Sequence, residues 1–154
     1  MNEKQQPSLL LHHFIPYRLA NLADTVSTAC SKIYRDTFGL SIPEWRILAR
    51  LAEQDGLNSK LIGRITFMDK SKVSRAVKQL EDKGLLVRST QQDKRVCQLS
   101  LTKKGLELYN QLVPIALEWE SELLSSLSIT EYRDLLRILE KLDVKAADLS
   151  NSDD

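Results

Sequence analysis

The stretch from Asp69 to Gly84 constrains the fold of this chain more than any other part of it. Four of its apolar residues recur at i, i+3, i+4 and i+7, the spacing that lines one side of a helix: Val73, Ala76, Val77 and Leu80. The other sides carry hydroxyl and basic side chains, and the cations of the first two turns are Lys70, Lys72 and Arg75. The helix macrodipole mildly disfavours cations at this end, and a bound polyanion would offset that cost. We therefore expect a helix that docks one face and binds nucleic acid with the other; for an isolated helix, a solvated basic face is the alternative.

The net charge of +1 hides a strong asymmetry along the 154 residues. Between Lys60 and Gly105 there are 12 lysines and arginines against 4 aspartates and glutamates, which leaves 10 against 17 for the rest of the chain. The central segment is therefore basic and the segments on both sides of it are acidic together, as expected when one region binds nucleic acid. The length, with 42% hydrophobic and 28% charged residues, is that of one globular domain with a sizeable core.

Three helices are predicted before the basic helix. A long one covers about residues 16–38. Ser41 and Glu44 form a capping box that opens a second helix, and Asn58 or Ser59 can cap a short third one. A tight turn then joins the third helix to the basic helix, and two short helices arranged in this way form a helix-turn-helix.

A β-hairpin is predicted after the basic helix. Its strands are expected at 85–88 and 96–101, around a polar turn at 89–95 that carries Lys94 and Arg95. Appended to a helix-turn-helix, such a hairpin is the wing of a winged helix. A basic tip suits a phosphate backbone or a minor groove, and a solvated turn is the alternative.

Two further helices are predicted at the end of the chain. Thr102 caps the first, which contains Pro114, and a capping box at 128–131 opens the second, before a polar, acidic tail. With an apolar cluster at 9–14, these helices carry more apolar surface than one small winged helix covers. We expect them to pair with the same elements of a second copy; packing within one chain is the alternative.

The predicted fold is mainly α with a small β-wing (α+β), a winged helix-turn-helix whose N- and C-terminal helices form a dimerisation domain. We expect a single domain over 1–154, a DNA-binding lobe at about 40–104, and dimerisation helices at about 9–38 and 105–147. A two-fold homodimer would present two recognition helices to successive major grooves.

Two motifs of this chain resemble those of the MarR family of bacterial transcriptional regulators. One is Ser-Lys-Val-Ser-Arg at 71–75, continued by Leu-Glu-Asp-Lys-Gly-Leu at 80–85, and the other, at 93–102, matches the wing signature Asp-x-Arg followed by Leu-x-Leu-Thr. The resemblance covers roughly residues 15–145. It implies a homodimer that binds a pseudo-palindromic operator in double-stranded DNA and represses, less often activates, transcription. It also implies release of the DNA when a small aromatic or phenolic ligand binds between the dimer helices and the DNA-binding lobe.

The resemblance, taken with the basic face, assigns nine residues to DNA. The residues of the recognition helix are Lys70, Ser71, Lys72, Ser74, Arg75 and Lys78, and those of the wing are Asp93, Lys94 and Arg95. By the resemblance, Ser71, Lys72, Ser74 and Arg75 would meet bases and adjacent phosphates in the major groove, and Arg95 would enter the minor groove. Asp93 would orient the wing by hydrogen bonding to its arginine or to nearby backbone.

Two pairs of residues are candidates for an effector site. Arg18 follows Tyr17, and Arg46 follows Trp45, so each pair could place a guanidinium beside an aromatic surface. This combination suits an aromatic carboxylate, because arginine offers a bidentate fork. His13 could assist. Salt bridges to helix carboxylates, or plain exposure to solvent, are the alternatives.

Other functions remain open at this point. A thiol redox switch would use Cys30 or Cys97, although neither belongs to a Cys-x-x-Cys pair, and a winged helix used only for protein contacts is a further alternative. There is no Gly-rich phosphate loop, nucleophile elbow or cluster of histidines with carboxylates, so we expect no enzyme, cofactor or metal site. No apolar run could cross a membrane and no secretory pattern opens the chain, so we expect a cytoplasmic protein without membrane contact.

Overall fold

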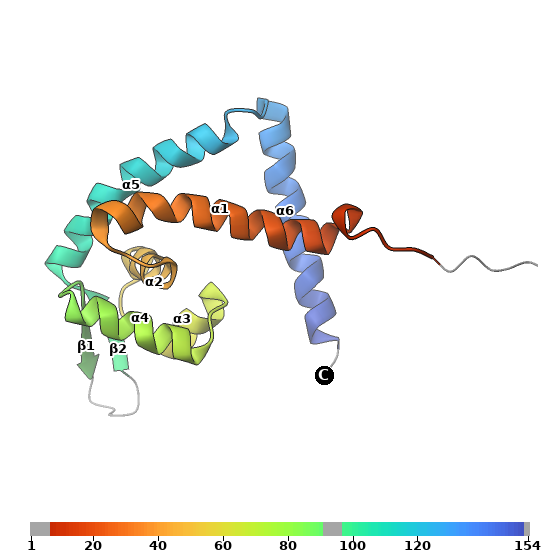
Figure 1. Ribbon diagram of the computed structural model, residues 1–154. Helices are drawn as coiled ribbons and strands as arrows, with labels where there is room; N and C mark the ends of the chain where they lie inside the picture. Colours follow the sequence, from red (N-terminus) through yellow and green to blue (C-terminus); the bar gives the residue numbers. More distant parts are fainter. Residues whose placement is uncertain (1–6, 91–96, 153–154) are drawn as a thin grey trace, which may run out of the picture. The chain divides into compact units, whose positions relative to one another are not determined.

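A computed structural model of the chain describes residues 7–90 and 97–152. The elements of these residues, in order, are η1 (Leu11–His13), α1 (Ile15–Phe38), α2 (Ile42–Glu53), α3 (Ser59–Thr66), α4 (Lys70–Asp82), β1 (Leu86–Thr90), β2 (Cys97–Leu101), α5 (Lys103–Leu124) and α6 (Ile129–Asn151) (Figure 1). The predicted fold class, mainly α with a small β-hairpin, is confirmed.

The chain divides into two compact units, Met1–Ile115 and Ala116–Asp154. The boundary falls inside α5, after Ile115, the residue that follows Pro114. Proline cannot donate the backbone hydrogen bond of a helix interior, so Pro114 weakens the helix close to this boundary. The first unit holds the helix-turn-helix and the hairpin, and the second holds the end of α5 together with α6.

The ends of the helices follow the caps that the sequence predicts. Both capping boxes are present, at Ser41 with Glu44 before α2 and at Ser128 with Glu131 before α6. α4 has a cap that was not predicted: the backbone N–H of Lys72 donates to Asp69 Oδ1 over 2.8 Å. Each such cap contributes roughly 1 kcal/mol, so these residues fix where the chain enters each helix.

The apolar stripe of α4 is buried, as predicted. Val73, Ala76, Val77 and Leu80 are each at most 2% exposed. The helix packs on α2 and α3, and β1 contacts it as well (Figure 1). Burying one Val or Leu side chain contributes about 1.5–3 kcal/mol, so this stripe fixes which face of α4 remains free.

The hairpin pairs β1 with β2 in antiparallel register, from Leu86 opposite Leu101 to Thr90 opposite Cys97. Leu57 adds a one-residue bridge on the other side of β2, where the N–H of Leu99 donates to the Leu57 carbonyl over 2.8 Å. The sequence prediction that the turn begins at residue 89 was wrong, because 89 and 90 continue the ladder. The first strand also begins one residue later than predicted.

Close contacts fix the start of α5. The Gly105 N–H donates to Thr102 Oγ1 over 3.0 Å, which confirms the predicted cap, and Thr102 Oγ1 donates to the Gly84 carbonyl over 2.6 Å. Gly105 is buried, and a Cβ placed on it would overlap the carbonyl oxygen of Leu85. Only glycine allows the helix to approach the chain this closely.

The last helix is longer than predicted. A polar tail was expected after about residue 147, yet α6 continues to Asn151. The sequence contains no glycine or proline after Pro114, so nothing in it forces the helix to stop earlier.

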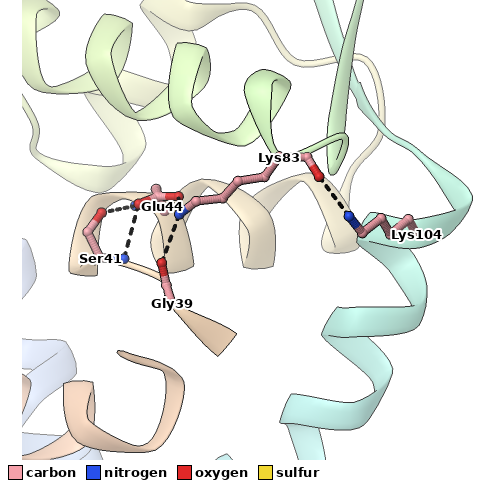
Figure 2. A network of polar contacts seen from close by, with 5 residues as sticks. All are labelled: Gly39, Ser41, Glu44, Lys83 and Lys104. Atoms are coloured by element: carbon pink, nitrogen blue, oxygen red, sulfur yellow. Dashed lines mark hydrogen bonds and ion pairs between the residues drawn. The ribbon is translucent and has the colours of Figure 1, made fainter. Parts of the chain in front are cut away.

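An ion pair with a buried carboxylate ties the C-terminal end of α4 to the start of α2 (Figure 2). Lys83, the residue after α4, places Nζ 2.5 Å from Glu44 Oε2, and the side chain of Glu44 is only 3% exposed. Lys83 Nζ also donates to the Gly39 carbonyl over 2.8 Å, while Lys104 Nζ donates to the Lys83 carbonyl over 2.9 Å. Four parts of the chain therefore meet at this one lysine.

Candidate nucleic-acid interface

The turn between α3 and α4 has the geometry of a helix-turn-helix. Phe67 adopts a left-handed conformation with φ 54°, and the Met68 N–H then donates to the Gly63 carbonyl over 3.0 Å. Met68 is 8% exposed and anchors the turn on the core, and Asp69 caps α4 immediately afterwards. The turn thus holds the N-terminal end of α4 in a fixed position against α3.

The face of α4 opposite the core carries every residue that was predicted to meet DNA from this helix. All of them are exposed: Lys70, Ser71, Lys72, Ser74, Arg75 and Lys78. Lys78 pairs with Asp82 over 3.2 Å, but this pair is exposed and contributes little to stability. Within the described part of the chain, no carboxylate forms an ion pair with Lys70, Lys72 or Arg75. Their charge is therefore available to an anion.

Three basic residues that the sequence reasoning did not single out lie beside α4. They are Lys60 and Arg64 on α3 and Arg88 on β1, and they line a groove of about 730 Å³ together with Lys70. Its apolar lining comes from Met68, Val73 and Val77. Arg88 is partly engaged, because its Nε donates to Glu81 Oε2 over 3.1 Å. In the sequence, only the excess of positive charge between residues 60 and 105 indicated these residues. The packing of α3, α4 and β1 is what brings their side chains together.

The wing tip lies outside the described residues, and with it the predicted DNA residues Asp93, Lys94 and Arg95. The two strands that carry the tip are described, and β1 contacts α4. The hairpin therefore belongs to the same compact unit as α4.

Two of the five predicted effector residues lie side by side on α2. Trp45 stacks on Tyr34 of α1 and on Tyr109 of α5, with ring centroids 5.5 and 6.3 Å apart. Arg46 is exposed and donates from Nη2 to Ser27 Oγ over 3.3 Å. An aromatic ring held on two sides and a guanidinium thus adjoin each other on this helix.

The other three lie near the start of α1. Tyr17 is 40% exposed, Arg18 and His13 are also exposed, and the His13 ring meets that of His12 edge to face at 4.3 Å. Arg18 precedes Ser27, the contact of Arg46, by nine residues, about 13 Å along a helix. The structure therefore separates this group from Trp45 and Arg46 within the chain.

Both cysteines are free and half-buried. Burial raises the pKa of the Cys30 thiol above its ordinary value, so this group is a thiol and not a thiolate at neutral pH. Burial, with a smaller effect of Cys30, also raises the pKa of Tyr34 to about 12. The surroundings of Cys30 are thus unlike those of a reactive thiolate.

Neither a metal site nor a membrane span is found in the part of the chain that the structure describes. No group of three or more histidine, cysteine, aspartate or glutamate side chains in it could hold a metal ion. No helix in it is long and apolar enough to cross a membrane.

The arrangement defines a class of protein: a helix-turn-helix with an exposed basic second helix, followed by an antiparallel hairpin, is a winged helix-turn-helix. The model of the MarR family matches residues 38–96. A solved MarR/EmrR family transcriptional regulator from Acinetobacter sp. ADP1 superposes with a TM-score of 0.83 at 30% identity, over 91% of this chain and 99% of that one. The chain belongs to the MarR family of transcriptional regulators.

Two relatives extend the comparison. The HTH-type transcriptional regulator SarZ of Staphylococcus epidermidis is 31% identical over 84 residues, 54% of this chain and 57% of that protein. This chain therefore spans little more than half the length of that relative. The HTH-type transcriptional repressor Rv2887 of Mycobacterium tuberculosis is 28% identical over 131 residues, 84% of this chain and 91% of that protein.

Proposed function

We propose that this protein is a homodimeric regulator that binds a pseudo-palindromic operator in double-stranded DNA and releases it when a small aromatic or phenolic ligand binds. The observation that carries the proposal is α4, whose apolar stripe is buried while its basic face is exposed and bears three cations without a carboxylate partner among the described residues. A helix of this kind enters the major groove with its N-terminal residues on base edges.

The side chains of α4 divide into two roles. Arg75 and Ser74 are proposed to contact bases, and Lys70, Lys72 and Lys78 are proposed to neutralise phosphates and position the helix. Arg95 at the wing tip is proposed to enter the minor groove, with Asp93 orienting it and Lys94 on the backbone. Arg95→Ala should then weaken binding to all DNA sequences evenly and reduce the salt slope.

Dimerisation is supported by apolar side chains left on the surface of both units. Examples from η1, α1, α5 and α6 with exposed fractions of 41–59% are Leu11, Leu22, Leu117, Leu136, Ile138 and Leu142. A second copy would cover such side chains, and a two-fold axis would place the two recognition helices on half-sites about 10 bp apart.

The effector is proposed to be an organic anion with an aromatic ring. The Arg46 guanidinium donates to Ser27 Oγ but forms no ion pair with a carboxylate in the described residues, and Trp45 adjoins it. Tyr17, Arg18 and His13 stay candidates for a second contact. The raised pKa of Cys30 disfavours the alternative of a thiol switch.

The experiment is DNA binding by the purified protein to its own upstream intergenic region, titrated with salt and repeated with aromatic carboxylates and their thioesters. Specific binding that weakens steeply with salt and is released by one compound supports the full proposal. Specific binding that no compound releases retains the regulator and rejects this effector class. Absent or salt-insensitive binding favours a winged helix used for protein contacts.

A further inference from the structure

We propose that Lys83 is a positioning residue for DNA binding: it ties the C-terminal end of α4 to the C-terminal end of α1, and so fixes the half-site spacing that a dimer accepts. This inference rests on the proposed function, because it needs two copies of α4 on one operator. It comes from the contacts of Lys83, from the helix ends that meet at this residue, and from the exposed apolar residues farther along α1.

The side chain of Lys83 joins the end of α4 to the connection between α1 and α2. Its Nζ donates to the Gly39 carbonyl over 2.8 Å and lies 2.5 Å from Glu44 Oε2 (Figure 2). Gly39 ends α1, and Glu44 lies in the first turn of α2. The Glu44 side chain is buried, so loss of the ammonium would leave its charge without solvent to compensate it.

The backbone at the end of α4 is held from the other direction by the start of α5. The Lys83 carbonyl accepts a hydrogen bond from Lys104 Nζ over 2.9 Å, and the Gly84 carbonyl accepts one from Thr102 Oγ1 over 2.6 Å. The Leu85 carbonyl accepts the Thr102 N–H over 3.0 Å. Three successive carbonyls therefore take donors from α5 or from the residue that caps it, so the end of α4 cannot shift without breaking these bonds or moving α5.

A cation suits this place on electrostatic grounds. The C-terminal end of a helix carries a partial negative charge, and α1 and α4 both end beside the Lys83 ammonium. The buried Glu44 adds a full negative charge. Without the ammonium these groups repel one another. Since α1 packs on α2, and α4 packs on α2, α3 and β1, Lys83 supplies a direct link between the ends of α1 and α4.

This link affects a dimer because α1 also carries apolar surface that is proposed to meet a second copy. Leu19 and Leu22 of α1 are 40% and 59% exposed. Leu22 lies about 25 Å along the helix from its end at Gly39. The angle between α1 and α4 therefore sets the distance between the two recognition helices. One base pair moves a half-site by about 3.4 Å and rotates it by about 35°, so a rigid link accepts one spacing.

The test uses the full chain and the operator that footprinting locates in the upstream intergenic DNA. Dissociation constants are measured by fluorescence anisotropy on three duplexes: the natural operator, the same operator with one base pair inserted between the half-sites, and a duplex with one half-site scrambled. All proteins are assayed at a temperature where circular dichroism shows them folded.

The variants separate positioning from stability. Lys83→Met removes the link, and Lys83→Arg keeps the charge. The double variant Lys83→Met with Glu44→Gln also removes the buried charge but keeps a residue that can complete the capping box, so its fold does not depend on the ion pair. Lys103→Met is the matched control, because the pair of Lys103 with Glu107 is 92% and 60% exposed.

The wild type should bind the natural operator at least about tenfold more tightly than the operator with the insertion, because a rigid dimer cannot engage both displaced half-sites. Lys83→Met and the double variant should reduce this ratio to about threefold or less, with affinity for the single half-site and its salt dependence unchanged. Lys83→Arg and Lys103→Met should retain the ratio of the wild type.

An unchanged ratio in both variants that carry Lys83→Met overturns the inference, and so does an equal loss of affinity on all three duplexes. A weaker salt dependence of these variants on the single half-site also overturns it, because Lys83 would then contact a phosphate. Wild-type binding that the inserted base pair does not weaken overturns the inference and leaves DNA regulation standing. Failure of the wild type to bind the upstream DNA specifically overturns the proposed function itself.

Discussion

Lys83 and Glu44 are 39 residues apart in the sequence, yet Lys83 Nζ lies 2.5 Å from Glu44 Oε2. The carboxylate is almost fully buried and also accepts the Ser41 N–H of its own capping box. One carboxylate therefore caps α2 and fixes the C-terminal end of α4. Removing the lysine would leave the buried charge with a single partner.

Lys83→Met is expected to lower the free energy of unfolding by roughly 2 kcal/mol, because it leaves a buried carboxylate uncompensated. Urea unfolding followed by circular dichroism measures this change. The matched control is Lys78→Met, whose pair with Asp82 is 70% and 63% exposed and should contribute less than about 1 kcal/mol. Equal losses in the two variants would contradict the importance of burial at Glu44.

Gly105→Ala is expected to destabilise the protein by more than about 2 kcal/mol, because the new Cβ would overlap the Leu85 carbonyl. The direction of this change in stability is informative, because alanine normally stabilises a helix by about 1 kcal/mol relative to glycine. Asn110→Ala, on the exposed surface of the same helix, is the control and should be neutral or slightly stabilising. A Gly105→Ala variant as stable as the wild type would show that α5 can shift away from β1.

Tyr34 should make stability depend on pH in the alkaline range. Its pKa is raised from 10.0 to about 12 in the folded protein, mainly by burial. The folded chain thus holds the phenol proton more tightly than the unfolded chain does, so this contribution is complete below pH 10 and is lost as the pH rises towards 12. Tyr34→Phe should flatten the fall in unfolding free energy over this range, and an identical slope in both proteins would contradict the assignment.

Cys30 should react slowly with alkylating reagents. Burial raises its pKa, so the thiolate fraction near neutral pH is smaller than for free cysteine. Iodoacetamide rates measured on Cys97→Ser, which leaves Cys30 as the only cysteine, should fall below those of a cysteine peptide and rise only at alkaline pH. Rapid alkylation at neutral pH would revive the thiol-switch alternative.

Local patterns predicted most of the fold, because caps and apolar periodicity are determined by neighbours in the sequence. Gly39, with φ 65°, ends α1 as expected, and the capping box at Ser41 opens α2. The pattern of α4 correctly separated its buried stripe from its exposed basic face. Predictions that needed partners distant in sequence were weaker: the end of β1 depends on its pairing with β2, which no local propensity reveals.

Of the candidate site, the sequence predicted only the exposed basic face of α4. Lys60, Arg64 and Arg88 line one groove because three elements pack together, and this cannot be read from the spacing of residues. Phe67 lies in the predicted turn, but its left-handed backbone and its exposure were not predicted. The predicted effector residues divide between the N-terminal end of α1 and α2 for a similar reason, since helix packing sets their separation.

DNA binding by two arginine-to-alanine variants tests directly whether α4 is the helix that contacts DNA. Arg75 lies on the exposed face of α4, whereas Arg137 lies on α6 and pairs with Asp134 over 3.0 Å. Binding of each alanine variant to the upstream intergenic DNA is measured by fluorescence anisotropy at several salt concentrations. The account predicts that Arg75→Ala loses about 1–3 kcal/mol of binding free energy, while Arg137→Ala binds like the wild type with the same steep salt dependence. Equal binding by both variants, or binding that salt does not weaken, would contradict the assignment of α4 as the DNA-recognition helix.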